Sequence, residues 1–306
     1  GQNFDIVLID QYKFFRRQEI KDIVAFFKII SNRNDSISLK RIIERFPNGI
    51  GDKKLQDIES NDYKKSRIYL SDFIDESVYT FGEKYSRLIS EYENNNIVIF
   101  DVESTGIDVT EDEIIQIAAI KINNKGEVTK KFERFLKPNK SVGTSEKVHG
   151  FSDKRLEEIG EDKKTVLIDF CKFIKGSLII GHNVTYDISI LGSELSRNKL
   201  EDIDIKYYDT LDIYRRFHSS LINHKLETLS NIFDTNHKPT HDAMDDILAT
   251  KELLVRAIEK DIKPTSLERI AKMDKYLGAF KELKGKLDNL FINSIGSGTD
   301  LFAWKK

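Results

Sequence analysis

The sequence is poor in several residue types, and each shortage excludes a class of protein. The 306 residues contain one cysteine, Cys171, which excludes a disulfide framework and a zinc site built from cysteines. No apolar run reaches the roughly 18 residues of a membrane span, and no basic stretch followed by an apolar run marks a signal peptide. Only four prolines leave little room for proline-rich linkers. We therefore expect a cytoplasmic protein without a membrane partner.

Neither sign of charge is in excess. The chain has 49 Lys+Arg and 51 Asp+Glu, and its formal net charge is −2. This balance excludes a generally basic protein that coats nucleic acid, although it leaves room for a local basic patch. A charged fraction of 33% and a hydrophobic fraction of 39% are typical of a globular protein. The length allows two domains, or one domain with a large insertion.

The hydrophobic pattern divides the chain into three zones. Residues 1–95 are predicted to be mostly helical, because Ile20, Val24 and Phe27 are among the apolar side chains that recur at helical spacing. From Ile97 onward, short apolar runs indicate strands that alternate with helices, and from Pro264 the pattern is helical again. We predict strands at 97–100, 114–122, 127–136, 178–181 and 205–208, and helices at 63–90, 165–174, 187–198, 210–217 and 242–260.

This order of elements predicts an α/β fold with two parts. Residues 96–260 should form a mixed five-stranded sheet with flanking helices. The two chain ends, residues 1–95 and 261–306, should together form an all-helical accessory domain.

The richest chemistry lies where the first predicted strand ends. Asp101 and Glu103 are two residues apart, so their side chains should point to the same face of the strand. Neighbouring carboxylates repel each other, and burying them is costly unless a cation neutralises them. Oxygen ligands of this kind suit Mg²⁺ or Mn²⁺. Solvated acids at a strand end explain the same pair equally well.

Two further motifs also place acids at the start of helices. Asn183 and Asp187 follow an apolar run, and Asp187 is either a ligand or a simple N-cap. His241 and Asp246 are five residues apart, so they can converge only if His241 lies in the loop before the helix. A lone histidine there would more often be a cap or a surface residue.

The three motifs together are more specific than each one alone. Asp-x-Glu-x-Thr-Gly, His-Asn-x-x-x-Asp and His-x-Ala-x-x-Asp resemble, in order and spacing, the motifs of the DEDDh exonucleases. That family includes the proofreading subunit of bacterial replicative polymerases. The resemblance covers roughly residues 96–258. It departs at Ser104, where threonine is commoner, and at Asp242, where a basic residue is frequent, and neither is an expected ligand.

The resemblance implies an RNase H-like fold and phosphodiester hydrolysis with two Mg²⁺ or Mn²⁺ ions. Digestion from 3′ to 5′ with release of nucleoside 5′-monophosphates is implied by the family alone. A histidine suits the task of deprotonating the attacking water, and His241 is the expected base. The expected metal ligands are Asp101, Glu103, Asp187 and Asp246. Further substrate contacts are expected from Ser104, Thr105, His149 and Asn183.

The N-terminal zone carries a second resemblance. Residues 48–55 look like the hairpin of a helix-hairpin-helix element, in which Gly49 and Gly51 let the backbone approach a phosphate. Lys53 and Lys54 add positive charge there. A plain turn between helices explains this short pattern as well.

The wider context of this hairpin resembles a helicase. About residues 8–60 resemble the stretch of UvrD/PcrA-type superfamily 1 DNA helicases that enters the helical 2B subdomain, and residues 264–294 look like helices that return to it. The resemblances together imply an exonuclease inserted into a 2B subdomain. The implied partners are DNA with a 3′ end, single-stranded or duplex, and the remainder of a helicase motor.

Two other functions stay open. One is a non-catalytic module that binds duplex DNA, and the other is a 3′→5′ exoribonuclease. The sequence contains no Gly-x-x-x-x-Gly-Lys-[Ser/Thr] phosphate loop, so we do not expect these residues to hydrolyse ATP.

Overall fold

The protein is described from a computed structural model, which places residues 15–46 and 48–296. It divides into two compact units. Residues 87–264 form one, which we call the sheet unit. Residues up to Ser86, together with those from Thr265 onward, form the other, which we call the helical unit. Predictions that concern residues 8–14 and 297–306 lie outside the described residues.

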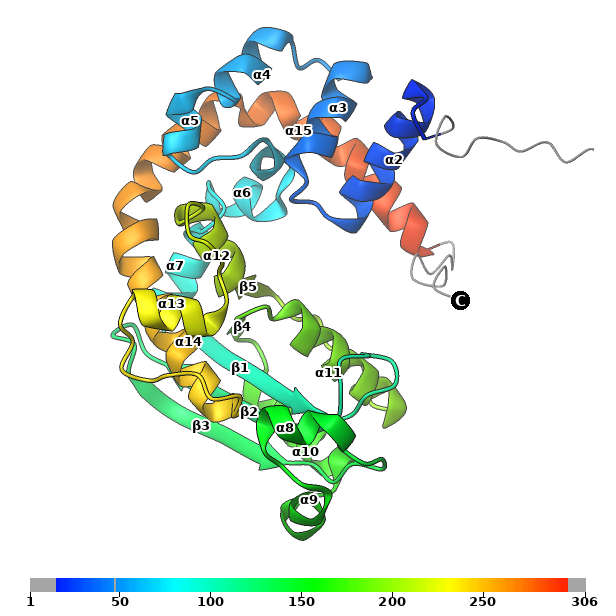
Figure 1. The fold of residues 1–306 in the computed structure, drawn as a ribbon. Helices are drawn as coiled ribbons and strands as arrows, with labels where there is room; N and C mark the ends of the chain where they lie inside the picture. The colour runs from blue at the N-terminus through cyan, green and yellow to red at the C-terminus, as the bar shows by residue number, and fades with distance from the viewer. Residues whose placement is uncertain (1–14, 47, 297–306) are drawn as a thin grey trace, which may run out of the picture. The chain divides into compact units, whose positions relative to one another are not determined.

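The sheet unit is built on a mixed five-stranded sheet of order β3-β2-β1-β4-β5 (Figure 1). β1 runs antiparallel to β2, and β2 runs antiparallel to β3, whereas β4 and β5 continue the sheet in parallel with β1. The strands are β1 (Ile97–Ser104), β2 (Ile114–Ile122), β3 (Val128–Phe135), β4 (Leu178–Gly181) and β5 (Tyr207–Asp209). The predicted α/β fold with an RNase H-like sheet is confirmed.

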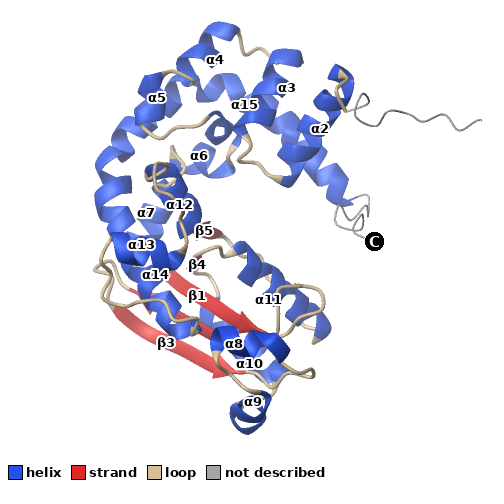
Figure 2. Ribbon diagram, viewed as in Figure 1, coloured by secondary structure: helices blue, strands red, loops and turns tan. Residues whose placement is uncertain are grey.

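Helices surround this sheet and follow its parallel strands (Figure 2). They are α7 (Ser86–Glu93), α8 (Glu146–His149), α9 (Asp153–Ile159), α10 (Lys163–Ile174), α11 (Thr185–Arg197), α12 (Thr210–Phe217), α13 (Leu226–Ile232) and α14 (Ala243–Ala257). Short 3₁₀ turns lie at η2 (Gly143–Ser145) and η4 (Lys263–Thr265), and a π-helical turn, η3 (Ile258–Ile262), follows α14.

β1 is central because both of its faces are covered. Val98, Phe100 and Val102 point into a core that includes Phe170 of α10 and Leu191 of α11. Since side chains alternate along a strand, Asp101 and Glu103 point to the other face, against which α14 packs. The fold thus places two acids under the first turns of α14.

The helical unit has its own core. Its helices are α2 (Gln18–Ser31), α3 (Ser36–Arg45), α4 (Asp52–Ile58), α5 (Asn61–Lys65), the 3₁₀ turn η1 (Leu70–Ile74), α6 (Glu76–Phe81) and the long α15 (Ser266–Gly296). Phe73 and Phe280 stack at its centre, with ring centroids 4.7 Å apart. Glu83 and Arg269 form a buried ion pair with an N–O distance of 3.0 Å. No helix among the described residues is both long and apolar enough to cross a membrane.

The segment predicted to be helical, residues 63–90, is mainly helical, but its helix is not continuous. This segment is broken into α5, η1, α6 and α7. The Asp75 carboxylate accepts a hydrogen bond from the backbone of Ser77 and so begins α6, and Gly82, with φ +93°, ends it. Polar caps and one glycine therefore outweigh the helical spacing of the apolar residues.

Candidate active site

The two acids of the first motif lie inside β1 rather than beyond its end. The prediction ended this strand at Phe100, but pairing with β2 continues to Ser104. Asp101 lies opposite Ala118, and Glu103 lies opposite Gln116. Both carboxylates are therefore held by a paired backbone on one face of the sheet.

Asp187 is fixed directly to this strand. It lies in the first turn of α11 and is only 4% exposed. The backbone amide of Val102, between Asp101 and Glu103, donates a hydrogen bond to the Asp187 carboxylate over 3.2 Å. This contact ties the start of α11 to the centre of the first motif.

Asp246 and His241 come from the start of α14. The backbone amides of Thr240 and His241 donate to one carboxylate oxygen of Asp246 over 3.0 and 3.3 Å. His241 has φ +62°, which is uncommon outside glycine, and its side chain is exposed. The loop thus wraps back onto Asp246, with the imidazole free to face solvent.

The pKa shifts show that these acids interact. Burial raises the pKa of Asp101 well above its ordinary value, and the charges of Asp187, Glu103 and Asp246 raise it further. Burial and the charges of Asp246 and Asp187 raise the pKa of Glu103 to about 8. Burial also raises the pKa of Asp187 to about 8 and raises that of Asp246. The structure therefore brings together all four predicted carboxylates as one electrostatic cluster, which we call the acidic cluster.

The acidic cluster has the donor chemistry of a divalent-cation site. Carboxylate oxygens suit hard cations, and several acids that share a poorly solvated place can ionise together only beside positive charge. Within residues 15–46 and 48–296, however, no three His, Cys, Asp or Glu side chains are already grouped as a metal site. The donor set therefore fits a cation, and the ligand roles stay predictions.

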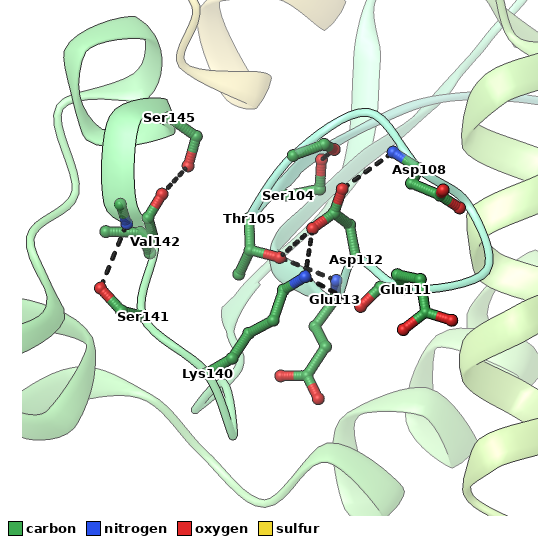
Figure 3. A network of polar contacts seen from close by, with 12 residues as sticks. Ser104, Thr105, Asp108, Glu111, Asp112, Glu113, Lys140, Ser141, Val142 and Ser145 are labelled. Atoms are coloured by element: carbon green, nitrogen blue, oxygen red, sulfur yellow. Dashed lines mark hydrogen bonds and ion pairs between the residues drawn. The ribbon is translucent and has the colours of Figure 1, made fainter.

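A polar network fixes the loop that follows β1 (Figure 3). The Asp112 carboxylate accepts hydrogen bonds from the Thr105 hydroxyl over 3.0 Å and the Asp108 amide over 2.8 Å, and it forms an ion pair with Lys140. A Cβ atom at Gly106 would overlap this carboxylate, so only glycine fits. The turn beside the acidic cluster is thus held in one shape.

Tyr186 holds the same turn from α11. Its hydroxyl donates to the carbonyl of Gly106 over 2.7 Å and lies 2.7 Å from the Ser104 hydroxyl. Ser104 also donates to the Gly106 carbonyl over 2.7 Å. Tyr186 could not be predicted from the sequence, because a tyrosine one position before Asp187 carries no local signal of a contact with residue 106.

Asp209 braces the turn of the second motif. Its carboxylate accepts hydrogen bonds from the backbone amides of Asn183 over 2.8 Å and of Val184 over 3.1 Å. Burial raises the pKa of Asp209 to about 6. Asn183 has φ +65°, and it is exposed. The exposed amide of Asn183 is therefore presented on a braced backbone, as a predicted substrate contact requires.

His149 is differently placed. It is 7% exposed, its Nδ1 accepts from the Phe151 amide over 3.0 Å, and its Nε2 lies 2.9 Å from the Ser145 hydroxyl. Burial lowers the pKa of His149, which favours the neutral ring. The ring thus supports the shape of its own loop, and its predicted contact with substrate stays a prediction.

The predicted hairpin, residues 48–55, belongs to the helical unit and precedes the residues of the acidic cluster in the sequence. Asn48 closes it: its amide nitrogen donates to the carbonyl of Ile43 over 2.7 Å, and its amide oxygen accepts from the backbone of Ile50 over 2.8 Å. Gly49 has φ +76°, and an added Cβ would meet nothing within 4 Å at Gly49 or Gly51. The backbone there is open to a close approach by a ligand.

Comparison with known proteins gives relatives that cover somewhat more than half of the chain. The DNA polymerase III PolC-type of Caldanaerobacter subterraneus subsp. tengcongensis is 32% identical over 180 residues, which is 58% of this chain and 12% of that protein. The PolC-type polymerase of Bacillus subtilis (strain 168) is 30% identical over 191 residues, 62% of this chain and 13% of that protein. The chain therefore spans about an eighth of the length of these relatives.

Solved structures resemble the chain more distantly. E. coli Exonuclease I in complex with a dT13 oligonucleotide has a TM-score of 0.49 and 21% identity, covering 56% of this chain and 42% of that one. Exonuclease X in complex with 5′ overhanging duplex DNA has a TM-score of 0.42 and 16% identity, covering 57% and 99%. Similarity at this level says nothing further about the activity of the chain.

One match extends through both units. Residues 1–297 match the family described as UvrD-like helicase C-terminal domain. The matched range takes in the hairpin at Gly49 and Gly51, the acidic cluster and α15. Because it leaves out only the last few residues, the chain belongs to the family of UvrD-like helicase C-terminal domains.

Proposed function

We propose that this chain is a metal-dependent 3′→5′ DNA exonuclease of the DEDDh type, carried on a 2B-like helical scaffold. The observation that carries the proposal is the acidic cluster, in which burial raises the pKa of four acids from three elements and the charges of Asp187 and Asp246 raise those of Asp101 and Glu103 further. Such an arrangement is costly for folding, and costly clusters of ionisable groups are typical of functional sites. The PolC-type DNA polymerases to which the chain is similar support DNA as the substrate.

The four carboxylates would hold two Mg²⁺ or Mn²⁺ ions, with Asp101 shared between them. Bound there, the ions would lower the pKa of a water molecule and offset the charge that develops on the phosphate. Glu103 and Asp246 would lie on the side of the attacking water, and Asp187 on the side of the leaving oxygen. The hydrogen bond from Val102 orients Asp187 for this role.

The remaining side chains would move protons and orient the strand. His241 is exposed in the loop next to Asp246, so it can take the proton of the attacking water. Glu103 and the backbone of Ser104 and Thr105 would meet the terminal 3′-hydroxyl, on the turn that Asp112 holds in shape. The exposed amide of Asn183 would contact the terminal nucleotide.

The helical unit would hold the DNA. The open backbone at Gly49 and Gly51 and the positive charge of Lys53 and Lys54 support contact with DNA phosphates. Membership of the UvrD-like helicase family supports a helicase motor as the partner of this unit in the full-length protein.

A degradation assay tests the nuclease proposal. The protein is incubated with single-stranded DNA labelled at its 3′ end and Mg²⁺, and mononucleotides are the expected product. Asp101→Asn and excess EDTA should each abolish their release. Asp204→Asn, which makes the same chemical change at an exposed aspartate of the same unit, should leave the rate unchanged. Failure of the wild-type protein to release mononucleotides would falsify the catalytic proposal and leave the non-catalytic binding module.

Matched oligonucleotides test the substrate class. A DNA and an RNA of the same sequence are digested in parallel, and faster digestion of the DNA is expected. A clear preference for RNA would instead identify the chain as an exoribonuclease.

The hairpin is tested by charge reversal. Lys53→Glu with Lys54→Glu should weaken duplex binding and reduce its dependence on salt, because fewer counterions are released. The same change at Lys64 and Lys65, both exposed on α5, is the control. Equal affinities of the two double variants would remove the hairpin from the DNA-binding surface.

A further inference from the structure

Gln116 is a buried polar residue that joins β2 to the start of α14, beside the acidic cluster. It is fully buried on β2 and lies directly opposite Glu103 of β1. Its amide oxygen accepts a hydrogen bond from the backbone of Ala243 over 3.2 Å. Its amide nitrogen lies 3.1 Å from a carboxylate oxygen of Glu133 and 3.4 Å from one of Asp242. Directly paired residues share a face of the sheet, so this side chain lies beside Glu103.

These contacts set the first turn of α14 against the sheet. Asp242 is the N-cap of that helix and accepts from the Met244 amide over 2.9 Å, and Ala243 is its first residue. The first turn carries Asp246, and His241 lies just before it. A shift of this turn would therefore move the ligand and the base of the third motif relative to Glu103.

Only an amide side chain can make both kinds of contact. Gln116 accepts from the helix backbone with its oxygen and donates to the two acids with its nitrogen. A glutamate of the same shape would still accept from Ala243, but it would place a third carboxylate between Glu133 and Asp242. In a fully buried place, both the lost donor and the repulsion are costly.

We propose that Gln116 is a positioning residue for the third motif and that it acts as a matched pair with Asp242. Because residue 242 is an acid, its partner on β2 has to donate a hydrogen bond, and Gln116 does so. This proposal rests on the proposed exonuclease function, because its readout is catalysis.

The test exchanges the amide of residue 116 and the carboxylate of residue 242. Gln116→Glu should lower kcat roughly 10- to 100-fold and raise the Mn²⁺ concentration needed for half-maximal rate. Loss of a residue that holds metal ligands in place has effects of this size in other metalloenzymes. KM for the oligonucleotide should change less than about twofold, because Gln116 touches no substrate. Adding Asp242→Asn should restore kcat to within about threefold of wild type. Asparagine can cap the helix as well as aspartate does, and it can donate to the new glutamate, while the exposed Glu133 can turn away to water.

Asn94→Asp is the control, since it makes the same amide-to-carboxylate change on the surface of the sheet unit. It should leave kcat unchanged, and thermal melting of all variants should confirm that each is folded. A folded Gln116→Glu variant with wild-type kcat and Mn²⁺ dependence would overturn the proposal, as would a low kcat that Asp242→Asn does not raise. Neither result would contradict the proposed exonuclease function, whereas an inactive wild-type protein would contradict both the exonuclease function and the role of Gln116.

Discussion

The acidic cluster should make the metal-free protein less stable as the pH rises, and Glu103→Gln should remove part of that loss. Burial and its acidic neighbours raise the pKa of Glu103 to about 8 in the folded protein, compared with about 4.5 when unfolded. The folded state therefore keeps a proton that the unfolded state releases. Below pH 4.5 both states are protonated and stability is full, and between pH 4.5 and 8 stability falls.

The size of the effect follows from the same shift. At about 1.4 kcal/mol for each pH unit, the interval from 4.5 to 8 corresponds to at most about 5 kcal/mol. The neighbouring acids relax when Glu103 is neutralised, so we expect Glu103→Gln to recover about 1 to 3 kcal/mol at pH 8.5 and almost nothing at pH 4.5. The variant should be more stable than wild type and inactive as a nuclease.

Urea unfolding in EDTA at pH 4.5, 6.5 and 8.5 measures this directly. Glu201→Gln, at an exposed position of the same unit, should follow the wild-type curve. Adding Mg²⁺ at pH 8.5 should raise the stability of wild type, by about 2.7 kcal/mol at a hundredfold excess over Kd, and raise that of Glu103→Gln less. The reasoning is refuted if wild type and Glu103→Gln lose stability in parallel between pH 4.5 and 8.5 and neither responds to Mg²⁺.

Three further changes test the surroundings of the site and the helical unit. Tyr186→Phe removes the hydroxyl that holds the carbonyl of Gly106, so it should lower kcat/KM roughly tenfold in the DNA assay, with a stability loss of about 1 kcal/mol. Arg269→Met leaves Glu83 buried without its partner and should cost about 3 to 5 kcal/mol in urea unfolding, without touching the acidic cluster. Burial lowers the pKa of His182 from 6.5 to about 4, so the unfolded state takes up a proton first as the pH falls. His182 should therefore contribute a loss of up to about 3 kcal/mol between pH 6.5 and 4, opposite in sign to the effect of Glu103, and His182→Gln should be more stable relative to wild type at pH 4 than at pH 6.5.

The parts of the fold that could be predicted are those with a continuous local signal. β2 and β4 have the predicted bounds because both are rich in isoleucine and other apolar residues, and α12 has them because Asp209 caps it just before Thr210. β1 was predicted too short, since its last residues are polar and are held in the strand only by pairing with β2. That pairing, which joins residues far apart in the chain, is absent from any local pattern.

The candidate site also contains residues that could be predicted from the sequence and residues that could not. The four acids expected as ligands could be selected from the sequence because the chemistry fixes residue types and spacing within each motif, and the fold brings these acids together. The residues that hold them could not be selected in this way. Gln116 and Asp242 are 126 positions apart, and Tyr186 lies 80 positions from Gly106. Such partners are fixed by the path of the chain through the sheet, so only the assembled fold reveals them.

The charges around the acids separate those proposed as ligands from those that form ion pairs within the fold. Asp112 and Glu113 lie close in sequence to the first motif, but Lys140 and Lys163 pair with them and help to lower their pKa values. The acidic cluster is different: the charged neighbours that raise the pKa of Glu103 are Asp246, Asp187 and Asp242. A lysine placed there would stabilise the fold and occupy the place of a cation. An acid that the fold leaves beside other acids ionises readily only when a ligand supplies positive charge, and this separates a binding site from a structural ion pair of the same composition.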